Sequence, residues 1–257
     1  MNTLRIVYDG TFDGFLTALH RAWQETVAEV SICRSQHNAP AFFETIEKVE
    51  SNPATASIEW KKIKDKMSSV TVQNIYCCYL SGLPGIENTI WQFLQYAFVS
   101  EQNIETDFAN KQVLKISQVA KMVHREKHRM EAFVRFRLMK EDLFFASVEP
   151  DFDVLPLIND HFTKRYADQR WLIYDLKRKY GLYYDLKETV AMEMTFDEHT
   201  ENGKRISEFL GDDEKLYEEL WKVYFKNVNI PERKNTKLHL RHVPKRYWKY
   251  LSEKQPV

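Results

Sequence analysis

The chain has 257 residues, of which 44% are hydrophobic and 29% charged, and its formal net charge at pH 7 is zero. This composition is typical of a globular protein with a substantial core, and it excludes a disordered or uniformly basic chain. The N-terminus has no signal-peptide pattern, and no stretch reaches the roughly 18 uninterrupted apolar residues of a membrane span. The three cysteines exclude a disulfide framework. We therefore expect a cytoplasmic protein with no metal or cofactor of its own.

The charged residues are segregated along the chain. Residues 111–140 and 226–257, here called the two basic segments, each carry nine Lys and Arg against two Asp and Glu. The segments 1–110 and 141–225 are acidic, with 8 basic against 13 acidic and 11 basic against 20 acidic residues. Basic segments can attract a polyanion although the whole chain is neutral. They can equally pack as complementary patches against acidic segments.

The first acidic segment is predicted to be mostly helical after one strand. The opening LRIVYDG is rich in β-formers and breaks at Asp9-Gly10, and residues 11–27 then have helical apolar spacing. Further helices are predicted at residues 54–70, 71–81 and 87–101.

The rest of the chain is predicted to form an antiparallel sheet with flanking helices. In chain order we expect a helix at 111–130, a strand at 132–138, a strand at DLFFASVEPD, a helix at DVLPLINDHFTKRY, a hairpin in QRWLIYDLKRKYGLYYDL, a strand at TVAMEMTF and a helix at DDEKLYEELWKVYFKNV. The basic tail that follows is predicted to be irregular, with Tyr247 and Trp248 fixing it to the surface. The fold class is α+β. We expect one domain over 1–257, with a soft boundary near residue 110 between a mainly helical and a sheet-containing part.

The stretch HRMEAFVRFR combines arginines with bulky apolar residues. Its alternation predicts a strand in which Phe133, Arg135 and Arg137 share one face. Guanidinium groups beside an aromatic ring suit a phosphate backbone and a stacked base. The alternative is a cross-strand ion pair with Glu141 or Asp142.

The candidate nucleic-acid-binding residues come from both basic segments. Arg129, at the end of the preceding helix, is expected to extend the same positive surface as the arginines of the strand. The histidines of this helix would strengthen anion binding as the pH falls through about 6.5. The full candidate set is Arg125, His128, Arg129, Phe133, Arg135, Arg137, Arg241, Lys245 and Arg246.

An acidic loop offers the strongest enzyme-like pattern. Glu149, Asp151 and Asp153 follow a predicted strand end, and His161 lies in the next predicted helix. Such groups can bind a divalent metal. The alternative is a structural loop in which Asp153 caps the helix that begins near Leu155, a role that stabilises by roughly 1 kcal/mol.

Other signatures of catalysis are weak or missing in the sequence. It contains no P-loop, dinucleotide fingerprint or G-x-S-x-G elbow. Cys33 with His37, and His124 with His128, have the i, i+4 spacing of metal-ligand pairs, but no second pair follows at finger-like spacing. Trp171 could stack on a base, although an aromatic residue in a hairpin more often packs in the sheet.

Several long motifs resemble a known family. They are YDGTFDGFL, EKHRMEAFVRFR, the stretch that begins EPDFDVLPLINDHF, LWKVYFKNVNIPERKN and PKRYWKYL. In this order they resemble, over nearly the whole chain, the bacterial family described as DNA metabolism or DNA repair proteins, domain of unknown function 4130 (DUF4130). The resemblance implies either a stand-alone partner of a radical-SAM protein of DNA modification or repair, or a region fused to a uracil-DNA glycosylase. The sequence resembles the stand-alone form, and the resemblance assigns no catalytic residue.

Three hypotheses follow. The favoured one is a DNA-repair accessory that binds nucleic acid through the two basic segments and acts with a radical-SAM partner, which supplies the redox cofactor. The second is a metal-dependent enzyme that acts on nucleic acid or a nucleotide through the acidic loop 149–153 and His161. The third is a pure protein-interaction module. Salt dependence separates the first from the third, and dependence on a divalent metal singles out the second.

Overall fold

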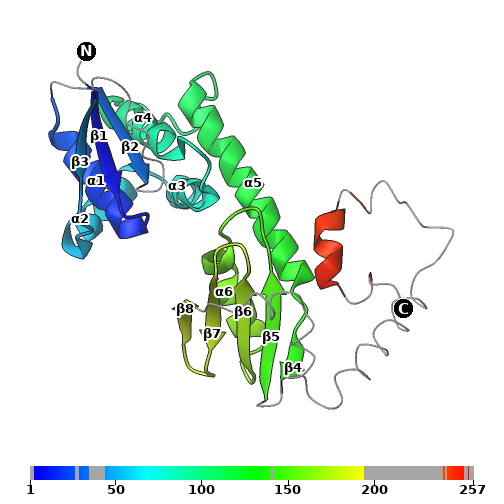
Figure 1. The fold of residues 1–257 in the computed structure, drawn as a ribbon. Coiled ribbons are helices and arrows are strands. Elements are labelled where there is room, and N and C mark those ends of the chain that lie inside the picture. The colour runs from blue at the N-terminus through cyan, green and yellow to red at the C-terminus, as the bar shows by residue number, and fades with distance from the viewer. Residues whose placement is uncertain are drawn as a thin grey trace. The chain divides into compact units, whose positions relative to one another are not determined.

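A computed structural model shows how the sequence folds (Figure 1). It describes residues 3–26, 29–34, 44–139, 142–193, 240, 242–251 and 254. The chain divides into two compact units, Met1–His124 and Arg125–Val257, and the division falls within helix α5 (Lys111–Phe133). The expectation of one domain stays a prediction.

The unit Met1–His124 combines a small parallel sheet with helices. Its elements before α5 are β1 (Thr3–Tyr8), α1 (Phe12–Gln24), β2 (Glu29–Arg34), β3 (Glu44–Lys48), α2 (Pro53–Lys66), α3 (Ser69–Ser81) and α4 (Ile86–Val99). β1 is the central strand and pairs in parallel with β2 on one side and β3 on the other. Side chains cap the starts of α1, α2 and α3, as where Thr11 Oγ1 accepts the Gly14 N–H at 3.0 Å.

The predicted strand and helices of this unit are confirmed by β1 and α1 to α4. The strands β2 and β3 are not predicted from the sequence. Both are short edge strands with charged ends, EVSICR and ETIEK, and Ile46 in β3 is exposed. β2 has only Val30 and Ile32 in alternation and β3 has only Ile46, which is too short an apolar pattern for sequence-based assignment.

The unit Arg125–Val257 is built around a mixed five-stranded sheet. Its elements after α5 are β4 (Arg137–Met139), β5 (Leu143–Val148), α6 (Leu155–Arg165), β6 (Arg170–Asp175), β7 (Tyr180–Tyr184), β8 (Thr189–Glu193) and the 3-10 helix η3 (Lys245–Tyr250). The strand order is β4-β5-β6-β7-β8, and α6 lies against one face of the sheet (Figure 1).

The α+β class is confirmed, and the structure corrects the expected pairing at one place in the sheet. β4–β5, β6–β7 and β7–β8 are antiparallel as expected, whereas β5 and β6 are parallel. The intervening helix α6 returns the chain to the same end of the sheet, as a parallel connection requires. The hairpin is confirmed, with its turn at residues 176–179.

Trp171 packs inside the sheet layer, which confirms the structural alternative for this residue. Its side chain is fully buried and stacks on Tyr184 with ring centroids 5.4 Å apart. Phe162 of α6 meets it edge to face at 6.2 Å. Trp171 is therefore unavailable for stacking on a base.

The strand expected at residues 132–138 is wrong in its first half. Helix α5 continues through Phe133, and the Val134 N–H still donates to the Met130 carbonyl at 3.1 Å. The strand β4 begins only at Arg137. Phe133, Arg135 and Arg137 therefore do not share a strand face, because good helix formers extend α5 across the alternating residues.

The remaining expectations concern the end of the chain. The helix expected at DDEKLYEELWKVYFKNV lies outside the described residues. Tyr247 is 1% exposed, which confirms it as an anchor of the tail, and residues 245–250 form η3 rather than an irregular segment. Within the described ranges, no helix combines the length and apolar character needed to cross a membrane.

Candidate anion-binding site

The parallel pair β5–β6 places two connections at one edge of the sheet. The carboxyl ends of parallel strands lie at the same edge, where open sheets commonly bind ligands. The loop after β5 and the turn after β6 meet there. The helix η3, red in Figure 1, is joined to the loop by two ion pairs, Arg246–Asp151 and Lys249–Glu149, each 2.5 Å long.

An open pocket of about 510 Å³ lies at this edge. Its lining residues are Glu149, Pro150, Asp151, Lys177, Lys245, Arg246 and Lys249. Four cationic side chains against two carboxylates leave an excess of two positive charges. The pocket therefore suits an anionic ligand.

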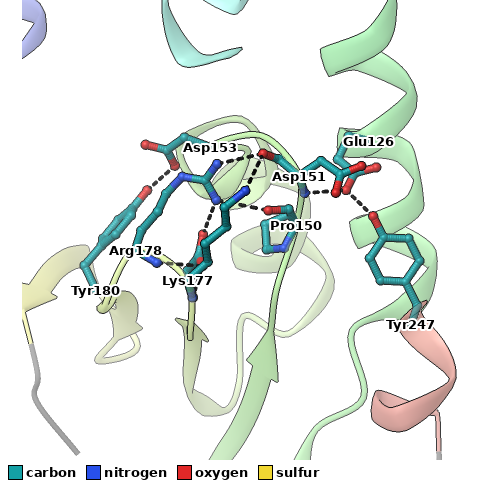
Figure 2. Close-up of polar contacts among 9 residues, drawn as sticks. Glu126, Pro150, Asp151, Asp153, Lys177, Arg178, Tyr180 and Tyr247 are labelled. Carbon is teal, nitrogen blue, oxygen red and sulfur yellow. Dashed lines mark hydrogen bonds and ion pairs between the residues drawn. The ribbon is translucent and has the colours of Figure 1, made fainter. Parts of the chain in front are cut away.

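A buried carboxylate lies beneath the pocket. Glu126 of α5 is 1% exposed, and its Oε1 accepts the Tyr247 hydroxyl and, at 2.8 Å, the Asp151 N–H (Figure 2). Its Oε2 lies 3.2 Å from Arg129 Nη1 and 3.5 Å from Arg246 Nη2. Glu126 thus links α5, the acidic loop and η3. Its hydrogen bonds, together with the charges of the two arginines, compensate the free-energy cost of burying the carboxylate.

The turn after β6 is organised by a second buried carboxylate. Asp175 is fully buried, and its Oδ1 accepts the N–H groups of Lys177 and Arg178 at 2.9 and 3.1 Å. Its Oδ2 lies 2.7 Å from Arg178 Nη1. Arg178 also donates to the carbonyls of Pro150 and Asp151 at 3.2 and 3.1 Å, and Lys177 Nζ donates to the latter at 3.3 Å (Figure 2). This network holds Lys177 at the pocket wall.

Glu149 serves as an ionised acceptor for η3. Its Oε2 accepts hydrogen bonds from Lys249 Nζ at 2.5 Å and from the Tyr250 hydroxyl at 2.7 Å. The Lys249 hydrogen bond, followed by that of Tyr250, holds the pKa of the Glu149 carboxyl below its usual range. Burial, followed by the hydrogen bond to Glu149, raises the pKa of Tyr250. At neutral pH Glu149 is therefore no proton donor for acid catalysis.

Asp153 does not cap the helix that follows it, so that expectation is wrong. The N-cap of α6 is Val154, which makes no side-chain capping bond. The Asp153 Oδ1 instead accepts the Tyr180 hydroxyl of β7 at 2.5 Å (Figure 2). Burial, followed by the charge of Asp153, raises the pKa of Tyr180.

The structure does not assemble the acidic loop into a metal centre. Glu149 pairs with Lys249, Asp151 with Arg246 and Asp153 with Tyr180, while His161 meets Phe162 edge to face at 5.0 Å. Among the described residues, no three His, Cys, Asp or Glu side chains form a group that could hold a metal ion.

Some of the basic candidates are brought together at Glu126. Arg129 and Arg246 both lie within 4 Å of its carboxylate, although they come from different basic segments. Phe133 packs against Tyr247 with ring centroids 5.6 Å apart, and Lys245 lines the pocket. The two basic segments therefore meet at this site.

Other basic candidates are placed elsewhere in the unit. Arg135 Nη1 donates to the Ala132 carbonyl at 2.7 Å, so its guanidinium folds back on the end of α5. His128, with 88% of its side chain exposed, lies 3.6 Å from Glu131. Arg137 is the first residue of β4, and Arg125 is exposed on α5. Arg241 lies outside the described residues.

The proposed histidine and cysteine pairs do not form metal sites among the described residues. His124 Nε2 lies 3.7 Å from Cys77 Sγ, and His37 is outside the described ranges. Burial raises the pKa of the neighbouring Cys78 thiol to about 12, so this thiol stays protonated at neutral pH.

Four residues of the site are not predicted from the sequence: Lys177 and Lys249, which line the pocket, and Glu126 and Tyr250, which hold its walls in place. Glu126 carries a signal that could have revealed it. It follows the buried Val123 by three positions and precedes the buried Met130 by four, so it occupies the apolar stripe of α5. An acidic residue at such a position requires buried partners.

Fold and site together define an α+β protein with a cationic pocket at the carboxyl ends of two parallel strands. The chain belongs to the family described as domain of unknown function, DUF4130, whose model matches residues 84–253. No curated protein matches the chain. A solved structure of a pGpG-specific phosphodiesterase from Vibrio cholerae is similar at 9% identity and a TM-score of 0.35, over 77% of this chain and 84% of that chain. A likeness this weak carries no functional argument.

Proposed function

We propose that this protein is a nucleic-acid-binding accessory of DNA metabolism or repair. The observation that carries the proposal is the meeting of the two basic segments around Glu126, beside a pocket with an excess of two positive charges. Lys and Arg side chains gathered from distant segments onto one surface are typical of sites that bind phosphates.

The cellular setting of the proposal comes from the family resemblance alone. It comprises action beside a radical-SAM protein, which supplies the redox cofactor, and a relationship to regions fused to uracil-DNA glycosylases. The chain contributes the nucleic-acid-binding surface in this scheme, and the chemistry belongs to the partner.

A protein-interaction module is the second candidate, and one observation favours it. Arg246 and Lys249 of the C-terminal basic segment already pair with Asp151 and Glu149 of an acidic segment. These pairs show that part of the basic charge serves the fold of the unit. The excess of cations in the pocket favours nucleic acid over this alternative.

A variant without the three lysines of the pocket tests the proposal. Replacing Lys177, Lys245 and Lys249 with alanine is expected to weaken binding of single-stranded and duplex DNA about equally across sequences. The slope of log K against log salt concentration should fall by about 2 to 3, because each phosphate contact releases condensed counterions. Fluorescence anisotropy at several salt concentrations measures this slope. All three lysines are exposed, so the variant should fold normally.

The matched control removes three exposed lysines of α2. Alanine at Lys61, Lys64 and Lys66 changes the net charge equally but leaves the pocket intact. This control should keep most of the wild-type affinity and salt slope. If both variants lose the same affinity, binding depends on overall charge and the pocket is not the site. If the wild-type protein binds no DNA, the interaction-module alternative replaces the proposal.

A further inference from the structure

We infer that the pocket receives a terminal phosphate monoester, as found at the end of a nucleic-acid strand or on a free nucleotide, in preference to an interior phosphodiester. The inference rests on the proposed function and names its ligand more closely. A phosphate monoester carries about −1.5 to −2 charge at pH 7. An interior phosphodiester carries one negative charge.

The charge balance of the pocket supports a dianion. Glu149 forms an ion pair with Lys249, and Asp151 forms one with Arg246, each 2.5 Å long. Four cations less two carboxylates leave two positive charges in a single pocket of about 510 Å³. A monoester brings a matching double charge to one point, whereas an interior backbone spreads its charges along the strand.

The size of the pocket also suits a single terminal nucleotide. A volume of about 510 Å³ lies within the range of small-ligand sites, roughly 300 to 1,000 Å³. That volume can hold one nucleotide unit.

The walls that carry the lysines are fixed before a ligand binds. The η3 wall is anchored by buried Tyr247, whose hydroxyl donates to Glu126. The opposite wall is anchored by buried Asp175, which accepts the Lys177 N–H at 2.9 Å. A preorganised pocket loses little conformational entropy on binding, so more of the electrostatic attraction to the ligand appears as affinity.

Oligonucleotides of one sequence that differ only at their ends provide the test. The set comprises a 12-nucleotide strand with a 5′-phosphate, one with a 3′-phosphate and one with hydroxyls at both ends. We expect at least one phosphorylated strand to bind about tenfold more tightly than the unphosphorylated strand, because the added charge gains charge-assisted hydrogen bonds. Replacing Lys177 and Lys245 with alanine should remove this preference.

Two exposed lysines outside the pocket provide the control for this variant. Alanine at Lys164 and Lys187 should leave the preference unchanged. Competition by a nucleoside 5′-monophosphate, compared with the nucleoside, separates the two sources of the ligand. Competition as strong as that of the phosphorylated strand assigns the pocket to a free nucleotide, and weaker competition assigns it to a strand end.

The outcomes separate this inference from the proposed function. Equal affinity for all three strands, with the salt slope still dependent on the pocket lysines, overturns the inference and leaves nucleic-acid binding in place. A preference for the phosphorylated strand that persists in the variant lacking Lys177 and Lys245 also overturns it. Binding of no strand at all overturns the proposed function itself.

Discussion

Replacing Glu126 with alanine is expected to lower the free energy of unfolding by about 3 to 5 kcal/mol, since removing one member of a buried charge network leaves its partners uncompensated. Glu126 is 1% exposed and accepts the Tyr247 hydroxyl and the Asp151 N–H. Its loss also leaves Arg129 and Arg246 without the carboxylate that they share. Urea denaturation followed by circular dichroism measures the effect.

Glu131 on the same helix is the matched control for Glu126. Its carboxylate lies 3.2 Å from Lys127 and 3.6 Å from His128, both on the surface of α5. Alanine at Glu131 should cost about 1 kcal/mol, because pairs three and four residues apart along a partly exposed helix face are weak. Glu126→Gln, which keeps the shape of the side chain, should fall between the two. An equal and small loss for both alanine variants would show that Glu126 does not organise the site.

Asp175→Ala is expected to have the second large effect, about 3 kcal/mol of unfolding free energy, because it removes a buried charge that satisfies three donors. The carboxylate is fully buried and accepts two backbone N–H groups of the turn together with Arg178 Nη1. The same substitution should weaken DNA binding, since Lys177 loses its fixed position at the pocket wall. Denaturation and anisotropy together measure the two effects.

Asp185 offers a control of the same chemistry in an exposed turn. Its Oδ1 accepts the N–H groups of Lys187 and Glu188 at 2.8 and 2.9 Å, in the connection between β7 and β8. Alanine at Asp185 should be far less destabilising, and it should leave DNA binding unchanged because Asp185 does not line the pocket. If the Asp175 variant keeps full stability and affinity, the turn network does not support the site.

The location of the acidic loop could be predicted from the sequence because the residues that mark it are adjacent to it in the chain. The apolar run DLFFASV ends just before Glu149, so the loop is placed after a strand without knowledge of the fold. The parallel pairing of β5 with β6 could not be predicted in this way. It pairs residues 27 positions apart, such as Leu143 and Arg170. This pairing brings the turn that carries Lys177 next to the acidic loop.

Two predictions from local sequence patterns were wrong because contacts between distant residues determine the structure there. Asp153 matches the preference for a helix cap, yet the Tyr180 hydroxyl binds its carboxylate and Val154 takes the cap position. The alternation around Phe133 suggests a strand, but Phe133 completes α5 and packs against Tyr247 from the far end of the sequence. A few alternating residues fit a helical as well as a strand period, so tertiary packing decides between them.

The charge segregation left two outcomes open, attraction of a polyanion and packing of complementary patches, and the structure shows the second. Arg246 and Lys249 pair with carboxylates of the acidic loop, as complementary patches would. The pocket nevertheless keeps more cations than carboxylates. Counting charges along the sequence could not separate these roles, because the balance depends on which residues share one pocket.

Hydrogen–deuterium exchange of the wild-type protein, with and without a single-stranded oligonucleotide, tests most directly whether nucleic acid binds at this pocket. Backbone amides that a ligand covers or stabilises exchange more slowly. We expect slower exchange in peptides that cover residues 149–154, 176–179 and 245–250, with no change in α2. Binding that protects other parts of the chain and leaves these three segments unchanged would show that nucleic acid binds elsewhere.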